Sequence, residues 1–232
     1  MSLTPPVGDL LPRRGNLISK AIARLMMLAS GWRFDGPLPN LKKFVLIVGP
    51  HTSNWDFLIG TMAMFALGIR ATYLSKDTLF KAPSGFVFRW IGGVPVDRQS
   101  PHNVVEQMIE HFKNRDRMIL AISPEGTRKK TPRWRTGFYW VALGAGVPIV
   151  AVALDFSRKR YVIHPPQVMT GDAEQEIAHL QTFFRAEQAR KPERYGERPN
   201  RAHRGRWAGI GLPLLRRRRR CRGLSWTAEV PT

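Results

Sequence analysis

The chain has 232 residues, of which 43% are hydrophobic, and a formal net charge of +20. It is long enough to bury one substantial core, and its charge indicates a polyanionic partner, which could be phosphates, an acidic protein or an anionic membrane surface. The single cysteine, Cys221, excludes an intramolecular disulfide and a cysteine-based metal site, which favours a reducing compartment.

The chain begins without the pattern of a secretory signal, because Met1 to Leu11 lacks a charged start and an apolar run. Residues 17–32 then predict a helix with a broad apolar face. That helix is too short to cross the ~30 Å apolar core of a bilayer. It could lie on a membrane surface, or it could pack on the domain as an ordinary first helix. We assign 1–35 to this amphipathic N-terminal segment.

The next element is the short, β-branched run at 44–48, which is typical of a strand buried on both faces. His51 follows it, on a loop just past the carboxyl end of the strand, where open α/β sheets build their sites. Residues 55–67 predict a buried helix whose first turn contains Asp56. A carboxylate there could accept a hydrogen bond from one imidazole nitrogen and leave the other free to remove a proton from a hydroxyl or water.

A structural interpretation of the same residues stays open. Thr52, Ser53 or Asn54 could cap the helix, and the segment fits a variant of the capping box. Asp56 would then be favoured only because first-turn carboxylates complement the helix dipole.

The remaining apolar runs alternate in period between strand and helix. Strands are predicted over 71–74, 94–96, 117–122, 147–154 and 161–163. Helices are predicted over 83–91, 101–112, 137–146 and 173–189. This alternation predicts a single α/β domain at 36–189, with a largely parallel or mixed sheet flanked by helices.

A second polar loop follows the strand at 117–122. Glu125, Gly126 and Arg128 would lie at the same sheet edge as His51, where the guanidinium could hold a phosphate through two parallel hydrogen bonds. Gly126 permits close backbone approach. A third junction, after 94–96, delivers Arg98. Each loop taken alone could instead be a solvated turn.

The segment at 190–232 differs in composition from the rest of the chain. It carries thirteen basic and three acidic residues, a net of +10, and residues 216–220 are all arginine. Such a segment cannot bury enough apolar area to offset chain entropy, so we expect disorder or an isolated helix. It could attract anionic lipid, bind nucleic acid nonspecifically, or have no function.

Four blocks of the sequence, in order, resemble the glycerophospholipid acyltransferase family, the enzymes that acylate lysophosphatidate and related acceptors. The blocks are His51 to Asp56; Lys76, Leu79 and Pro83 leading to residues 92–98; Pro124 to Arg128; and Val147 to Val150. The resemblance covers roughly residues 30–189. Each block alone is a weak signal, whereas the ordered set is a strong one.

The resemblance implies acyl transfer from a thioester, on coenzyme A or acyl carrier protein, to a lipid hydroxyl. His51 would be the general base, and Asp56 would orient it. The positions that match the family's acceptor-binding residues are Arg98, Glu125, Gly126, Thr127 and Arg128. No acyl-enzyme, metal or cofactor beyond the thioester co-substrate is implied. We expect a lysophospholipid acceptor, an anionic membrane surface as partner, and a peripheral location on the cytoplasmic face of a membrane.

Three departures from the family pattern bear on the acceptor rather than on the chemistry. They are Pro50 where Asn is usual, Thr78 where Glu is common, and Ser123 where Phe is usual. Another lysolipid therefore remains possible. Two other function classes also remain: a basic protein that binds membrane or nucleic acid, and a His/Asp hydrolase. A specific nucleic-acid partner is not expected, since no known recognition motif is present.

Overall fold

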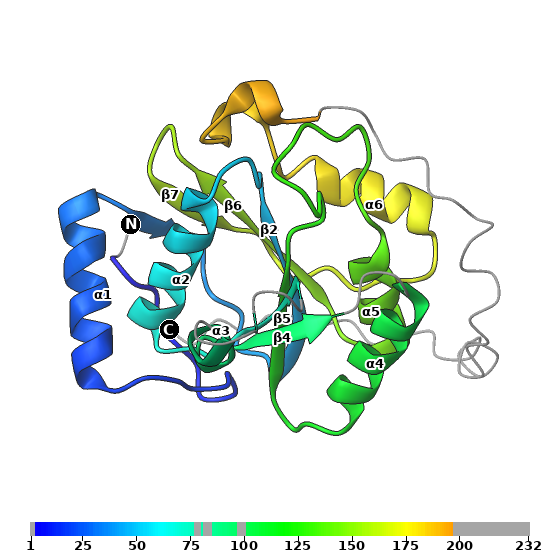
Figure 1. Cartoon of the computed structure of the whole chain (residues 1–232), viewed down its shortest axis with the longest axis horizontal. Coiled ribbons are helices and arrows are strands. Elements are labelled where there is room, and N and C mark those ends of the chain that lie inside the picture. The colour runs from blue at the N-terminus through cyan, green and yellow to red at the C-terminus, as the bar shows by residue number, and fades with distance from the viewer. Residues whose placement is uncertain (1–2, 77–79, 81–84, 97–100, 197–232) are drawn as a thin grey trace, which may run out of the picture. The chain divides into compact units, whose positions relative to one another are not determined.

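A seven-stranded mixed sheet with helices on both faces forms the centre of the computed structural model (Figure 1). The structure describes residues 3–76, 80, 85–96 and 101–196. The strands are β1 (Arg33–Asp35), β2 (Lys43–Gly49), β3 (Thr72–Lys76), β4 (Gly93–Val96), β5 (Met118–Ile122), β6 (Ile149–Asp155) and β7 (Arg160–Ile163). The α-helices are α1 (Leu17–Ser30), α2 (Trp55–Leu67), α3 (Gly85–Trp90), α4 (Pro101–Lys113), α5 (Gly137–Ala145) and α6 (Ala173–Gln181).

The strand order is β1-β7-β6-β2-β5-β3-β4, and β2 pairs in parallel with both β5 and β6. β7 is antiparallel to β6, and β1 is parallel to β7. The predicted α/β class with a mixed sheet is therefore confirmed. Because parallel neighbours end at the same edge, the loops after β2 and β5 lie side by side.

β2 is buried as its apolar run predicts, with Phe44, Val45 and Ile47 at most 1% exposed. Burying side chains of this size contributes roughly 1.5–3 kcal/mol each. α1 and α2 share a hydrophobic core with one face of the sheet, whereas α4, α5 and α6 lie on the opposite face (Figure 1). The central strand that carries the His51 loop is therefore held from both faces.

Strand β1 was not predicted. It has only three residues, and its partner is β7, far along the sequence. Its sequence continues directly into Gly36 and Pro37, which are typical loop residues. Since its extended conformation depends on tertiary pairing, the local pattern carries little signal for it.

The predicted helix over 173–189 was too long. α6 ends at Gln181, and the 3-10 helix η2 follows at Ala186–Gln188. Phe184 turns inward, is 4% exposed and packs edge-on against Trp134, with ring centroids 5.5 Å apart. Burial of this aromatic side chain outweighs continuation of the helix.

Ordered structure also continues past the boundary predicted at residue 189. The 3-10 helix η3 spans Pro192–Arg194, and Tyr195 is buried, with its hydroxyl donating to the Phe184 carbonyl at 2.9 Å. The part of the predicted tail at 197–232, which includes Cys221, lies outside the described residues.

Helix α1 starts at a capping box, in which the Ser19 amide donates to the Asn16 side chain at 2.8 Å, and it ends at Gly31 with a left-handed φ of 78°. Only Ala23 and Met27 of α1 are buried. The predicted apolar face is thus largely exposed instead of packed. Among the described residues, none of the helices combines the length and apolar character needed to cross a membrane.

Candidate active site

The loop after β2 carries His51, and the first turn of α2 carries Asp56. The imidazole Nδ1 lies 3.3 Å from Asp56 Oδ2. The Asp56 side chain is 1% exposed and that of His51 is 22% exposed. The carboxylate thus lies inside the protein, behind an imidazole that solvent can reach.

Asp56 is held by the loop that it supports. Its Oδ2 accepts hydrogen bonds from the backbone amides of Thr52 and Ser53, each at 2.7 Å, and its Oδ1 accepts one from the Ser53 hydroxyl at 3.2 Å. These donors fix the carboxylate and compensate its burial. When Nδ1–H of His51 donates to Asp56, Nε2 is left as the proton acceptor.

Glu125 lies beneath the His51 loop. Its Oε1 accepts a hydrogen bond from the backbone amide of His51 at 3.0 Å. The residue is 8% exposed, and Oε2 has no hydrogen-bond partner among the described residues. Burial raises the pKa of the Glu125 carboxyl, and the hydrogen bond from His51 opposes that rise only in part. In this structure, therefore, Glu125 contacts the backbone of the His51 loop.

The loop after β5 turns at Gly126, whose φ of 64° is left-handed and disfavours any residue with a Cβ. The Thr127 hydroxyl accepts from the Lys129 amide at 3.2 Å, which stabilises the turn. Arg128 is exposed and donates through a terminal nitrogen to the Asn54 side chain. The loops after β2 and β5 are therefore joined at the site.

Thr52, Ser53 and Asn54 were the three candidate caps of α2. Asn54 occupies the cap position but makes no side-chain capping hydrogen bond, because its carboxamide binds Arg128 instead. The Ser53 hydroxyl accepts from the Trp55 amide at 3.1 Å. No local pattern predicts the pairing of Asn54 with Arg128, since the two residues are 74 positions apart.

A second unpredicted support comes from the C-terminal side. The Lys191 amide donates to the Thr52 hydroxyl at 3.1 Å, and Arg194 donates to the Thr52 carbonyl at 3.5 Å. These residues belong to the segment at 185–195, which we call the strap. The strap thus holds the residue next to His51, and its contacts again depend on long-range packing that local patterns do not report.

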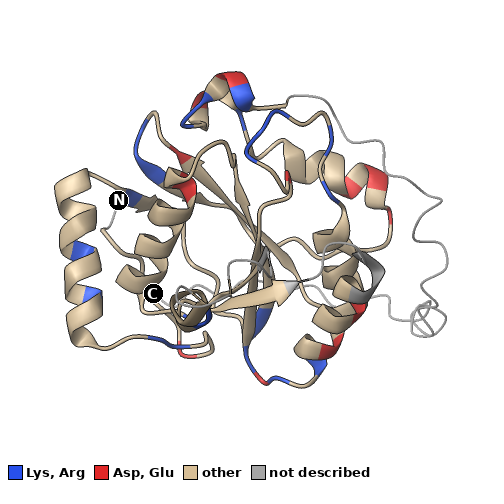
Figure 2. Ribbon diagram, viewed as in Figure 1, with Lys and Arg blue, Asp and Glu red and all other residues tan. Residues whose placement is uncertain are grey.

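The remaining predicted site residue, Arg98, lies outside the described residues, as do Thr78 and the Leu79 and Pro83 positions of the second block. Within the part of the chain that the structure describes, no group of three or more His, Cys, Asp or Glu side chains is placed to hold a metal ion. Figure 2 shows that Lys and Arg residues occur along the β5–α5 loop, the β6–β7 turn and η3.

The geometry defines an α/β protein in which one edge of the sheet presents a histidine, His51, whose imidazole is held by the carboxylate of Asp56. The loop that carries Arg128 lies beside it. The model of the Acyltransferase family matches residues 34–155, which is more than half of the chain and includes both loops. The chain belongs to this family.

Relatives of this chain carry a more specific name. It is 25% identical, over 151 residues, to a 1-acyl-sn-glycerol-3-phosphate acyltransferase of Haemophilus influenzae, with 61% of each chain covered. It is 27% identical, over 115 residues, to the protein of that name from Escherichia coli, covering 47% of this chain and 46% of the relative. The chain thus covers less than two thirds of the length of these relatives.

The fold has a counterpart among solved structures. The 1-acyl-sn-glycerophosphate acyltransferase PlsC from Thermotoga maritima superposes with a TM-score of 0.50 at 18% identity, covering 68% of this chain and 71% of the other. This likeness supports the fold, and the family match is the stronger indication of the chemistry.

Proposed function

We propose that this protein transfers a fatty acyl group from a thioester to the hydroxyl of a lysophospholipid such as 1-acyl-glycerol-3-phosphate. The observation that carries the proposal is the His51–Asp56 pair, with 3.3 Å between Nδ1 and Oδ2, beside the loop that bears Arg128. The relatives named for this activity support the same acceptor class.

In the proposed reaction, His51 Nε2 removes the proton of the acceptor hydroxyl while Asp56 stabilises the imidazolium that forms. The oxygen attacks the thioester carbonyl carbon, and a C–O bond forms. The C–S bond then breaks, and the thiol leaves with the proton returned by His51. The substrate supplies the nucleophile, so this mechanism has no acyl-enzyme.

Arg128 is the proposed phosphate ligand in the described part of the site, and Arg98 is proposed for the same role. Asn54 holds the Arg128 guanidinium through one nitrogen, which leaves further donors for a phosphate. The thioester on coenzyme A or acyl carrier protein is the proposed co-substrate, and no other cofactor is proposed.

The test supplies purified protein with labelled acyl-CoA and lysophosphatidate, and then with acyl carrier protein thioesters. Labelled phosphatidate is the expected product. Release of free fatty acid alone would indicate a hydrolase, and neither product from either donor would contradict the proposal. A panel of lysolipid acceptors would then identify the preferred headgroup.

We further propose that Glu125 positions His51 through the backbone rather than contacting the acceptor. Glu125→Gln keeps an oxygen that can accept from the His51 amide, so kcat is expected to stay within about threefold of wild type. Glu125→Ala removes the acceptor, and kcat should fall roughly tenfold with acceptor KM little changed, in line with the ~1–3 kcal/mol cost of an unsatisfied buried group. A raised acceptor KM with unchanged kcat would instead indicate acceptor contact.

Glu125→Gln should also change how the free energy of unfolding depends on pH. Because burial raises the pKa of Glu125 above its ordinary value of 4.5, the folded state holds that proton to higher pH than the unfolded chain does. As the pH rises from the ordinary pKa of the carboxyl to its raised pKa in the folded state, ionisation of Glu125 therefore lowers the free energy of unfolding. Below the ordinary pKa it has no effect. Urea unfolding at about pH 4 and pH 7 should show Glu125→Gln gaining stability over wild type only at the higher pH.

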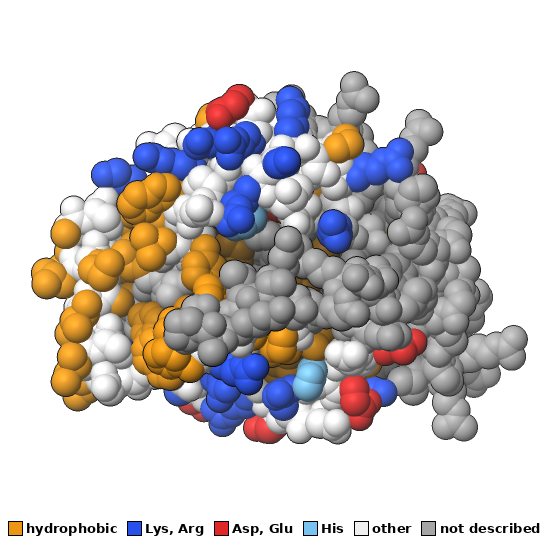
Figure 3. All heavy atoms as spheres, in the orientation of Figure 1, with side chains coloured by type: hydrophobic (Ala, Val, Ile, Leu, Met, Phe, Trp, Pro, Cys, Tyr) orange, Lys and Arg blue, Asp and Glu red, His pale blue; other side chains and the backbone are white. Residues whose placement is uncertain are grey.

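The exposed face of α1 supports a peripheral membrane location. Leu17, Ile18 and Leu25 are 84%, 70% and 67% exposed. Figure 3 shows apolar side chains gathered over this part of the molecule, with basic side chains above and below them. Large apolar side chains of α2 and α3 are exposed as well: Trp55, Leu58, Phe86 and Trp90. We propose that this face rests on an anionic membrane, so that the acceptor lipid need not leave the bilayer far.

The double change Leu17→Glu and Leu25→Glu should weaken binding to anionic vesicles at least tenfold, since each buried leucine contributes roughly 1.5–3 kcal/mol. Val168→Glu is the matched control, because this residue is 76% exposed on the segment between β7 and α6. Vesicle sedimentation measures the binding. Equal losses in both variants, or none in the double variant, would contradict the proposed face.

A further inference from the structure

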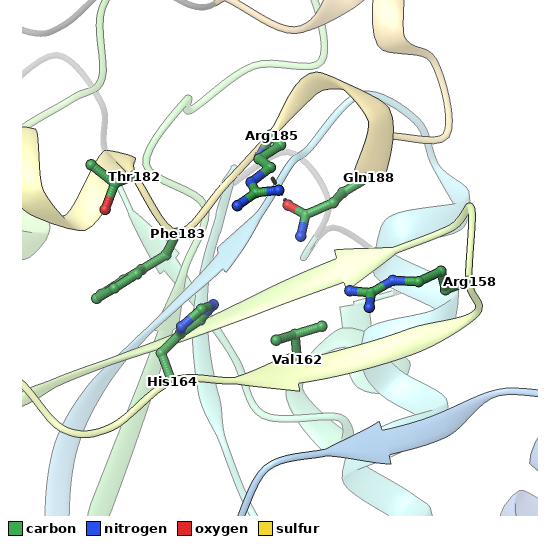
Figure 4. A pocket seen from close by; sticks show the side chains of 7 residues that line it. All are labelled: Arg158, Val162, His164, Thr182, Phe183, Arg185 and Gln188. Atoms are coloured by element: carbon green, nitrogen blue, oxygen red, sulfur yellow. Dashed lines mark hydrogen bonds between the residues drawn. The ribbon is translucent and has the colours of Figure 1, made fainter.

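A pocket of about 300 Å³ lies away from the His51–Asp56 pair, between β7 and the segment that joins α6 to η2 (Figure 4). Tyr161 and Ile163 of β7 belong to the core shared with α1 and α2, whereas Val162 lines the pocket. Since successive strand residues point to opposite faces, the pocket lies on the sheet face opposite α1 and α2.

Two guanidinium groups from separate segments stand at this pocket. Arg158 belongs to the β6–β7 turn, and Arg185 follows α6; Figure 4 shows the guanidinium of Arg158 directed over Val162. Asp155 Oδ2 binds Nε of Arg158 at 2.7 Å, and Glu187 lies 4.0 Å from a terminal nitrogen of Arg185. The contact with Asp155 uses Nε, so it leaves the terminal fork of Arg158 for an anion.

Gln188 adds a buried donor. It is 7% exposed, and its Oε1 accepts from the Arg185 amide at 2.9 Å. This hydrogen bond fixes which way the carboxamide faces, and Figure 4 shows its nitrogen directed toward the Val162 side of the pocket. An anion held between the arginines therefore has a neutral donor beside it.

His164 supplies the complementary acceptor. Its ring stacks on Phe183 with centroids 4.2 Å apart and 14° between planes. Burial lowers the pKa of His164, so the imidazole is neutral at neutral pH. A hydrogen bond between the ring and the Phe183 backbone opposes this shift only in part. Its Nε2 is buried and has no hydrogen-bond partner among the described residues. A neutral, unpartnered imidazole nitrogen is suited to accept from a ligand hydroxyl.

We propose that this pocket binds a phosphorylated polyol, whose phosphate contacts Arg158, Arg185 and the Gln188 amide and whose hydroxyl donates to His164. Such a group occurs both in free polyol phosphates and in phospholipid headgroups. Hydrogen bonds of the strap also connect the pocket to the site at His51. The backbone carbonyl of Gln188 accepts from the Phe156 amide at 2.9 Å, and further along the strap the Lys191 amide donates to the Thr52 hydroxyl.

The experiment titrates the full-length protein with glycerol 3-phosphate, inorganic phosphate and glycerol, by calorimetry and by amide NMR. Saturable binding of glycerol 3-phosphate is expected, tighter than that of inorganic phosphate or glycerol. Arg158→Gln and Arg185→Gln should each weaken it roughly ten- to hundredfold, as expected for charge-assisted hydrogen bonds. Lys159→Gln is the matched control, since it removes one charge from the same turn and Lys159 does not line the pocket.

Two further arms locate the site and the source of the ligand. His164→Phe keeps the aromatic stack and should abolish the preference for glycerol 3-phosphate over inorganic phosphate. Arg128→Gln removes the phosphate ligand proposed for the His51 site, so saturable binding that survives in this variant and is lost when Arg158→Gln is added belongs to the pocket, whereas complete loss of binding in Arg128→Gln alone would overturn the proposal. Tighter binding of dihexanoyl phosphatidate than of glycerol 3-phosphate would identify a lipid headgroup as the source. Absence of saturable binding at millimolar concentration, or equal losses in Lys159→Gln, would also overturn the proposal.

Discussion

His51→Ala is expected to remove most of the acyl-transfer activity and leave the fold intact. The imidazole is the proposed base, and general-base catalysis contributes roughly 10²–10⁴-fold. kcat should therefore fall by about that factor. The His51 side chain is 22% exposed, so its removal should cost little stability. Steady-state transfer of labelled acyl groups, with thermal unfolding measured in parallel, checks both expectations.

Asp56→Asn is the informative companion variant. The carboxylate accepts from two backbone amides, a hydroxyl and the imidazole, so its loss should lower both kcat and stability. A variant at His51 that retains wild-type turnover would remove the base from the mechanism, whatever the behaviour of Asp56.

Arg128→Ala is the second large effect that we expect. The exposed guanidinium stands beside the His51 loop and is oriented by Asn54. If it holds the acceptor phosphate, its loss should reduce kcat/KM for lysophosphatidate by roughly 10- to 100-fold, the value of a charge-assisted hydrogen bond, and should leave the donor KM nearly unchanged. Lys129→Ala is the control, since it removes an adjacent exposed charge.

Two further variants in the same assay separate the positioning of the Arg128 guanidinium from its charge. Asn54→Ala should produce part of the Arg128 defect, because it frees the guanidinium without removing it. Arg128→Lys should restore little, since lysine cannot make two parallel hydrogen bonds to a phosphate. Equal increases in donor and acceptor KM for Arg128→Ala would contradict a phosphate-binding role.

Much of the fold was predictable because buried strands and amphipathic helices leave periodic patterns. The run at 44–48 predicted β2, and residues 55–67 predicted α2 with matching bounds. The failures occurred where long-range packing outweighs local preference. β1 exists through its pairing with β7, and α6 stops early because Phe184 packs against Trp134.

In the candidate site, too, local features could be predicted from the sequence and long-range contacts could not. The proximity of His51 and Asp56 followed from their spacing across a strand–helix junction, which is a local property. Glu125 was found as a residue, but its hydrogen bond to the His51 backbone spans 74 positions and required the pairing of β2 with β5. The contact of Asn54 with Arg128 and the hold of Lys191 on Thr52 have the same origin.

The sequence by itself therefore determined the α/β class, the basic character, the apolar face of the first helix and the residues of the two polar loops. Each of these is encoded in residue type and in spacing over a few turns or strands. Only the tertiary structure decided what those residues touch: that the face of α1 stays exposed, that Glu125 supports the His51 loop and that the strap reaches Thr52. Contacts between distant segments depend on how the whole sheet is ordered, and local periodicity carries no record of that order.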